Sequence, residues 1–132
     1  MTKGYIYRYK CSFKGKHPFV FIKYIDEERF IGCMLTHTKH SKRFLQNESM
    51  KPEHFIESTS QFLDCKNPVT YSNSNIVRVF LIKKTNDIID TPCGGLTDTG
   101  ITFLESIIDR EKIADCESKD QWPEFEYIEN ND

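Results

Sequence analysis

The sequence contains no apolar run long enough to cross a membrane. Among its 132 residues the longest uninterrupted apolar runs are four residues, at 19–22 and 79–82, whereas a membrane-spanning helix needs about 20. The first residues also lack the apolar core of a secretory signal. These absences predict a soluble, cytoplasmic protein with no membrane partner.

Closely spaced cysteines are absent as well. The five cysteines stand apart at positions 11, 33, 65, 93 and 116. An odd number without a Cys-x-x-Cys pair argues against a disulfide framework and against a zinc ribbon, and we expect most of these side chains to be buried as small apolar groups. The chain has no glycine-rich phosphate loop and no Gly-x-Ser-x-Gly motif. We therefore expect neither a bound metal nor a cofactor.

Aromatic residues, by contrast, are plentiful, and charge is unevenly distributed. Aromatics make up 13% of the chain, which predicts a folded domain, because disordered chains have few. Residues 1–51 carry 11 Lys/Arg and 4 Asp/Glu, whereas residues 52–132 carry 7 and 16. A basic, aromatic-rich half is a candidate surface for a polyanion, although a charge block is also compatible with ordinary solvated surface.

The first third of the chain predicts three strands. Residues 4–11 alternate tyrosines with other side chains, a pattern typical of a strand. A second strand over 19–25 follows Pro18, and a third over 29–36 returns after an acidic turn at 26–28. We expect the second and third strands to form a hairpin with a longer loop.

The rest of the chain predicts one buried strand and one helix. Residues 75–84 form the clearest buried strand, and residues 97–112 have helical periodicity with Thr97 as N-cap. The other segments are a loop at 37–47, an ambiguous and partly helical stretch at 52–64, a turn-rich stretch at 67–75 and a break at 91–95. Strands followed by a late helix predict an α+β, mainly β, small-barrel domain. We expect it to occupy residues 1–113, before an acidic tail at 114–132.

Two polar segments flank the predicted hairpin. The second strand begins where the third ends, so Lys16 and His17 are expected near Thr36, His37 and Thr38. Such a cluster suits RNA cleavage without a metal: a 2′-hydroxyl must lose a proton, the leaving 5′-oxygen must gain one, and the charged phosphorane needs donors. Histidine can act as base or acid near neutral pH, and lysine and threonine can donate hydrogen bonds to the phosphoryl oxygens.

Plainer interpretations of the same residues stay open. His17 is also compatible with a surface residue at the start of a strand, and His37 with a loop residue. The spacing His37-x-x-His40 resembles half of a metal site, but it lacks a partnered Asp, Glu or Cys.

Several short motifs follow one another along residues 4–113. They are Gly-Tyr-Ile-Tyr at 4–7, His-Pro-Phe-Val-Phe-Ile at 17–22, Ile-Gly-Cys-Met-Leu-Thr-His-Thr at 31–38, Ser-Asn-Ile-Val at 74–77 and Gly-Leu-Thr at 95–97. In this order they resemble the MazF/PemK toxin family. That family has a Gly-Asp-Ile-Tyr strand, an Arg-Pro-Val-Val-Val strand, a third strand ending in Thr-Ser, and Gly-x-Leu-Ser/Thr before a C-terminal helix.

The resemblance implies an SH3-like β-barrel with a C-terminal helix, a homodimer, and the toxin of a toxin–antitoxin system. The activity it implies is a sequence-selective, metal-independent endoribonuclease that cleaves single-stranded RNA to 2′,3′-cyclic phosphate and 5′-hydroxyl ends, neutralised by a cognate antitoxin. The family's Thr-Ser falls on Thr36 and on His37 or Thr38. The basic loop residues expected to bind RNA are Lys14, Lys39, His40, Lys42 and Arg43.

The chain departs from the family at its main catalytic position. The family arginine before proline falls on His17. Either His17 acts in place of that arginine, with Lys16 as the neighbouring cation, or catalysis is lost. The alternatives to a ribonuclease are an immunity or inhibitor protein and a nucleic-acid-binding barrel. The latter would use Tyr5, Tyr7, Tyr9 and Phe13 as stacking platforms, although cross-strand packing also accounts for the tyrosines. The tail, with Trp122, Phe125 and Tyr127 among its acids, is either a self-masking segment or a terminus of no special function.

Overall fold

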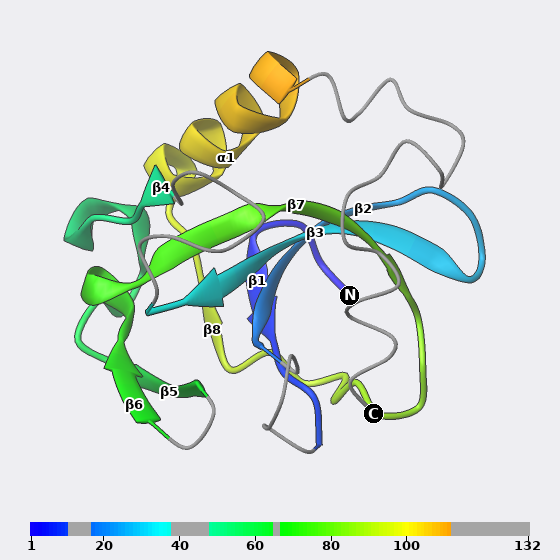
Figure 1. Cartoon of the computed structure of the whole chain (residues 1–132), viewed down its shortest axis with the longest axis horizontal. Helices are drawn as coiled ribbons and strands as arrows, with labels where there is room; N and C mark the ends of the chain where they lie inside the picture. The colour runs from blue at the N-terminus through cyan, green and yellow to red at the C-terminus, as the bar shows by residue number, and fades with distance from the viewer. Residues whose placement is uncertain (11–16, 38–47, 65–66, 112–132) are drawn as a thin grey trace.

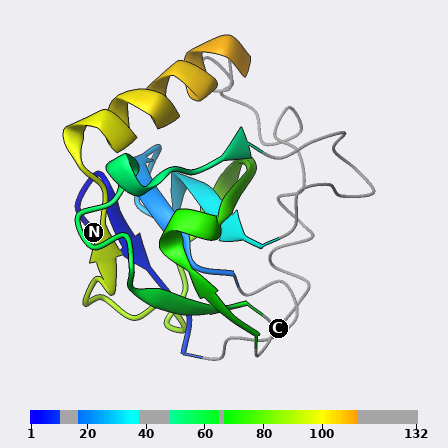
Figure 2. The same ribbon diagram turned by 90° about the vertical axis from the view of Figure 1, so that its left-hand side faces the viewer.

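A six-stranded antiparallel sheet forms the body of the protein. The computed structural model describes residues 1–10, 17–37, 48–64 and 67–111. The sheet has the strand order β4-β7-β3-β2-β1-β8, and a separate hairpin of β5 and β6 lies on the far side of the molecule from α1, the one α-helix of the described residues (Figures 1 and 2). The sheet strands are β1 Tyr5–Tyr7, β2 Phe19–Tyr24, β3 Arg29–Thr36, β4 Glu48–Ser49, β7 Asn75–Lys83 and β8 Gly94–Gly95.

The remaining elements are short apart from the helix. They are the 3₁₀ turn η1 Pro52–His54, the strands β5 Gln61–Asp64 and β6 Asn67–Thr70, the 3₁₀ turn η2 Tyr71–Asn73 and the helix α1 Asp98–Glu111. The strongly curled sheet makes a half-barrel, and α1 is the C-terminal helix of the described part. The mainly β, α+β prediction is therefore confirmed. Within these described residues, no helix combines the length and apolar character needed to cross a bilayer.

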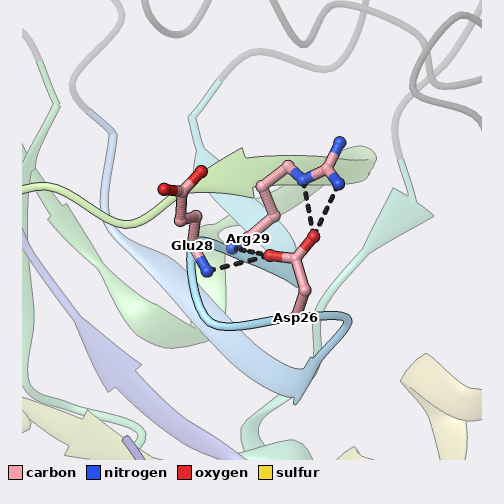
Figure 3. A network of polar contacts seen from close by, with 3 residues as sticks. All are labelled: Asp26, Glu28 and Arg29. Atoms are coloured by element: carbon pink, nitrogen blue, oxygen red, sulfur yellow. Dashed lines mark hydrogen bonds and ion pairs between the residues drawn. The ribbon is translucent and has the colours of Figure 1, made fainter.

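The predicted hairpin of the second and third strands is present. Phe19 pairs with Met34, and the pairing continues antiparallel toward the turn at Asp26. Asp26 Oδ1 accepts hydrogen bonds from the backbone N–H groups of Glu28 and Arg29, each at 2.8 Å, and its other oxygen accepts from the Arg29 guanidinium (Figure 3). These contacts lower the pKa of Asp26, with the Arg29 side chain the largest cause.

Buried clusters lie on both faces of the central strands, because successive residues of a strand point to opposite sides. On one face Ile6, Val20 and Cys33 join the helix residues Leu104 and Ile107 in a mixed apolar core. The opposite face carries an aromatic cluster, defined by Tyr7, Tyr9, Phe19, Phe21, Phe30, Met34, Ile82 and Ile88. The alternation predicted for the first strand therefore divides its side chains between two buried layers.

The helix begins as predicted at Thr97. The Thr97 hydroxyl accepts a hydrogen bond from the N–H of Gly100 at 3.2 Å and donates one to the carbonyl of Glu53 at 2.6 Å. The N–H of Thr97 also donates to the carbonyl of His54 at 2.9 Å. The cap thus serves two purposes, because it starts α1 and joins it to η1.

The ambiguous and turn-rich stretches contain more strand than the sequence predicted. The stretch 52–64 is a single 3₁₀ turn followed by β5, and 67–75 begins with β6. The predicted break at 91–95 ends in the edge strand β8, which pairs with β1. Tertiary packing accounts for these differences: Tyr71 is stacked between the rings of Phe55 and Phe62, at 5.2 and 5.6 Å.

Candidate functional site

The two polar segments predicted to converge are anchored by one backbone contact. Leu35 N–H donates to the carbonyl of Pro18 at 2.8 Å, just beyond the Phe19–Met34 pair. In an antiparallel pair, moving one residue forward along β3 means moving one residue back along β2. His17 and Thr36 are therefore neighbours at the open end of the β2–β3 hairpin, and His37 follows directly.

The three described residues of this site differ in exposure. Thr36 is only 2% exposed, whereas His17 is half-buried and His37 is exposed. A threonine buried to this degree is suited to positioning its neighbours, and the two imidazoles are the groups that solvent or a ligand can reach. The exposed or half-exposed titratable groups described at the hairpin end are consequently the imidazoles of His17 and His37.

Asn75 holds the backbone at this end and was missed by sequence reasoning. It is 3% exposed and pairs with both Thr36 of β3 and Ser49 of β4. Its Oδ1 accepts a hydrogen bond from Ser49 Oγ at 2.9 Å, and its Nδ2 donates to the carbonyl of His37 at 3.3 Å. A polar residue at the start of the strand predicted to be buried was the signal available in the sequence.

The other predicted site residues lie outside the described part of the chain. They are Lys14, Lys16, Thr38, Lys39, His40, Lys42 and Arg43. The acidic tail at 114–132 and its aromatic residues lie outside it too. Among the residues that are described, no group of three or more His, Cys, Asp or Glu side chains could hold a metal ion.

The tyrosines of the first strand pack internally. Tyr7 and Tyr9 are 2% and 4% exposed, and the Tyr7 ring stacks on Phe19 at 6.1 Å. The hypothesis that both are stacking platforms for nucleic acid is therefore wrong, and cross-strand packing accounts for them. Tyr5 alone of these three tyrosines is exposed.

The expectation that the cysteines are buried holds for one of the two described. Cys33 is buried in the mixed apolar core, and Cys93 is exposed. Cys93 precedes the edge strand β8, and its Sγ lies 3.5 Å from the carbonyl of Ile6. The cysteines at 11, 65 and 116 lie outside the described residues.

Comparison of the chain with protein-family models, with curated proteins and with solved structures finds no match in any of the three. The class of protein is therefore defined by the structure itself: in the described residues, a mainly β domain with a strongly curled antiparallel sheet, one C-terminal helix, and the histidines His17 and His37 at the open end of its central hairpin.

Proposed function

We propose that this protein is a metal-independent endoribonuclease acting on single-stranded RNA, the toxin of a toxin–antitoxin system with an SH3-like barrel fold. The observation that carries the proposal is the proximity of His17 to the Thr36–His37 segment at the open end of the hairpin, held by the Leu35–Pro18 hydrogen bond. The order of strands, curled sheet and final helix supports the family resemblance, and the basic N-terminal half supports a polyanionic substrate.

The histidine pair provides both proton transfers that the reaction requires. One neutral imidazole removes the proton of the 2′-hydroxyl, and the 2′-oxygen attacks phosphorus. The bond from phosphorus to the 5′-oxygen breaks, and the second imidazole, protonated beforehand, gives its proton to that oxygen. The products are a 2′,3′-cyclic phosphate and a 5′-hydroxyl. Two histidines in opposite protonation states predict a bell-shaped pH–rate profile.

The test is cleavage of a labelled mixed-sequence RNA in EDTA by the wild type and by the variants His17→Asn and His37→Asn. Asparagine keeps a hydrogen-bonding side chain but transfers no proton near neutral pH, so each variant should lose about 10²- to 10⁴-fold in rate. His54→Asn is the matched control, because it makes the same substitution at a histidine on η1, which takes no part in the β2–β3 hairpin.

The outcomes separate the ribonuclease from the alternatives. Cutting at defined sites that is lost in both hairpin variants and kept in the control supports the proposal. A folded wild type that leaves RNA intact, or hairpin variants as active as the wild type, would overturn it. RNA binding without cleavage would indicate the nucleic-acid-binding barrel instead. The proposal also includes a homodimer and a cognate antitoxin, which co-expression and sedimentation would test.

A further inference from the structure

A cavity of about 230 Å³ opens beside the edge strand β8, two strands away from β2 in the sheet. Ligand pockets for drug-sized molecules measure about 300–1,000 Å³, so this cavity suits a single planar group. Its lining comes from β1, β8, the turn after η1 and the start of η2. The lining residues are Tyr5, Ile56, Glu57, Ser60, Tyr71, Pro92, Gly94 and Gly95.

The glycine pair of β8 allows the walls of this cavity to approach the strand. A Cβ on Gly94 would lie 2.8 Å from the Tyr71 hydroxyl, and a Cβ on Gly95 would lie 3.1 Å from both Ile56 Cδ1 and Tyr5 Cδ1. Side chains at these two positions would collide with the walls, so only glycine allows Tyr71, Ile56 and Tyr5 to come this close to the strand. The Gly94–Gly95 pair, which lies in the predicted break at 91–95, thus forms the floor of the cavity.

The side walls are apolar and unusually exposed. Tyr5 is 40% and Ile56 is 60% exposed. Only four large hydrophobic side chains are exposed in the described residues, and two of them meet at this cavity. The exposed ring of Tyr5, with the aliphatic Ile56 beside it, offers a face on which a flat ring can stack.

One charged group stands among the eight lining residues, the carboxylate of Glu57. It accepts a hydrogen bond from Ser60 Oγ at 3.2 Å on Oε2. Tyr71 adds no second charge: its hydroxyl donates to the carbonyl of Cys93 at 3.2 Å, and burial is the main cause that raises the pKa of its phenol. The polar side of the cavity is therefore a carboxylate, which accepts hydrogen bonds and donates none.

We propose that this cavity is a guanine-binding subsite, in which the base stacks on the ring of Tyr5, with Ile56 at its edge, and donates hydrogen bonds to Glu57. Guanine presents two adjacent donors on its Watson–Crick edge, the N1–H and the N2 amino group, which match the two oxygens of one carboxylate. Adenine, cytosine and uracil each place an acceptor next to their donor on that edge and meet the carboxylate with one hydrogen bond and one repulsion. Proteins read single-stranded RNA in this way, by stacking bases on aromatic rings and bonding to their edges.

A guanidinium group also has two parallel donors, but the surroundings favour a nucleotide over an arginine. Burial is the main cause that raises the pKa of the Tyr71 phenol, and the nearby charges of Arg8 and Glu57 act on it in opposite directions, so a positive charge lies near this side of the cavity as well as the carboxylate. A like charge disfavours a cationic side chain in the cavity, whereas it attracts the phosphate attached to a nucleotide. Apolar walls also penalise a permanent cation more than a neutral base.

This inference rests on the proposal that the chain acts on RNA, and a binding assay that involves no cleavage tests it separately. The probes are two fluorescent 2′-O-methyl oligouridines, one containing a single guanine and the other a single adenine; methylation removes the nucleophile. The wild type should bind the guanine oligonucleotide about 10-fold or more tightly than the adenine one. Glu57→Gln should weaken guanine binding by about 10- to 100-fold and leave adenine binding unchanged.

Three control variants sharpen this test. Glu53→Gln makes the same change of charge at an exposed glutamate outside the cavity, so it should preserve the guanine preference. Tyr5→Phe keeps the ring and should bind like the wild type, whereas Tyr5→Ala should lose about 5- to 150-fold, as expected for one stacked base. Circular dichroism of each variant confirms that it is folded.

Four outcomes decide between the two proposals. A guanine preference that depends on Glu57 in a protein that cuts no RNA would sustain the subsite and overturn the nuclease. RNA cleavage with equal binding of both oligonucleotides would sustain the nuclease and overturn the subsite. Equal binding by wild type and Glu57→Gln overturns the subsite in either case. The subsite would also be overturned if methylguanidinium displaced the guanine oligonucleotide better than guanosine did. That result would indicate an arginine-containing partner.

Discussion

The contact between Gly100 of α1 and the carbonyl of His54 predicts that alanine at position 100 destabilises the protein. Alanine is normally favoured over glycine inside a helix, by about 1 kcal/mol. Here, however, an added Cβ would lie 2.3 Å from the His54 carbonyl oxygen and 3.0 Å from its carbon. Both are backbone atoms, so no side-chain rotation relieves the clash.

The size of the effect follows from what must move. Relief requires α1 to withdraw from η1, which stretches the hydrogen bonds from Thr97 to the carbonyls of His54 and Glu53, now 2.9 and 2.6 Å. Each is worth about 1 kcal/mol, and residual overpacking costs about 1–3 kcal/mol more. After the gain in helix propensity, Gly100→Ala should lower the free energy of unfolding by about 2–4 kcal/mol.

Urea unfolding followed by far-ultraviolet circular dichroism measures this change directly. Thr102→Ala is the matched control, since Thr102 lies on the exposed side of the same helix and should gain a few tenths of a kcal/mol from propensity alone. If Gly100→Ala is as stable as the wild type or more so, η1 and α1 are not in the contact described and the reasoning fails.

Three further predictions concern buried side chains. Burial is the main cause that lowers the pKa of His54, whose Nδ1 accepts the Lys51 N–H at 3.0 Å. The unfolded chain therefore binds more protons than the folded protein near pH 6.5, so stability should fall as pH drops below 7. Thermal melts should show that the stability of His54→Asn depends less on pH. Asn75→Ala leaves the Ser49 hydroxyl and the His37 carbonyl without their partner, and denaturant unfolding should show a loss of about 1–3 kcal/mol, with RNA cleavage reduced as well; a variant equal to wild type in both would contradict the anchoring role. Phe19→Ala removes a fully buried ring and should cost about 3–5 kcal/mol by the same unfolding measurement, whereas a loss below 1 kcal/mol would mean that the aromatic cluster is not packed as described.

Local patterns were sufficient to predict the long elements. The third strand was predicted at its observed bounds, Arg29–Thr36, because an acidic turn and a polar loop delimit it. The helix was recognisable from Thr97, whose side chain caps it. Both are cases in which the sequence next to an element determines where that element begins and ends.

The shorter elements could not be predicted, because distant residues stabilise them. β8 is two glycines, which have low strand propensity, and it forms because β1 offers a partner on one side while Ile56 N–H donates to Gly95 on the other, at 3.0 Å. The cavity beside it depends on Tyr71, which is 24 residues away from Gly95 in the chain. The hairpin end was predictable because it needs only two strands that are adjacent in the sequence. The proposed guanine subsite was not, because its residues come from distant parts of the chain.

The two proposed sites lie on one sheet, and their separation makes a joint prediction. Ile6 of β1 pairs with Val20 of β2 on one side and with Gly94 of β8 on the other. With strands ~4.8 Å apart and ~3.3 Å per residue, His17 and the cavity floor are separated by roughly 14 Å along the sheet, or less because it curls. A single strand of RNA can span that distance with a few nucleotides.

Cleavage sites in a mixed RNA should accordingly carry a guanine at a constant, short offset from the cut. Glu57→Gln should relax that preference while cleavage continues, and His17→Asn should slow cleavage without changing the preference. Sequencing of the 5′-hydroxyl ends would measure both effects in one experiment. Cuts scattered without a guanine at fixed distance would show that the cavity and the hairpin end do not engage the same strand, even if each proved functional by itself.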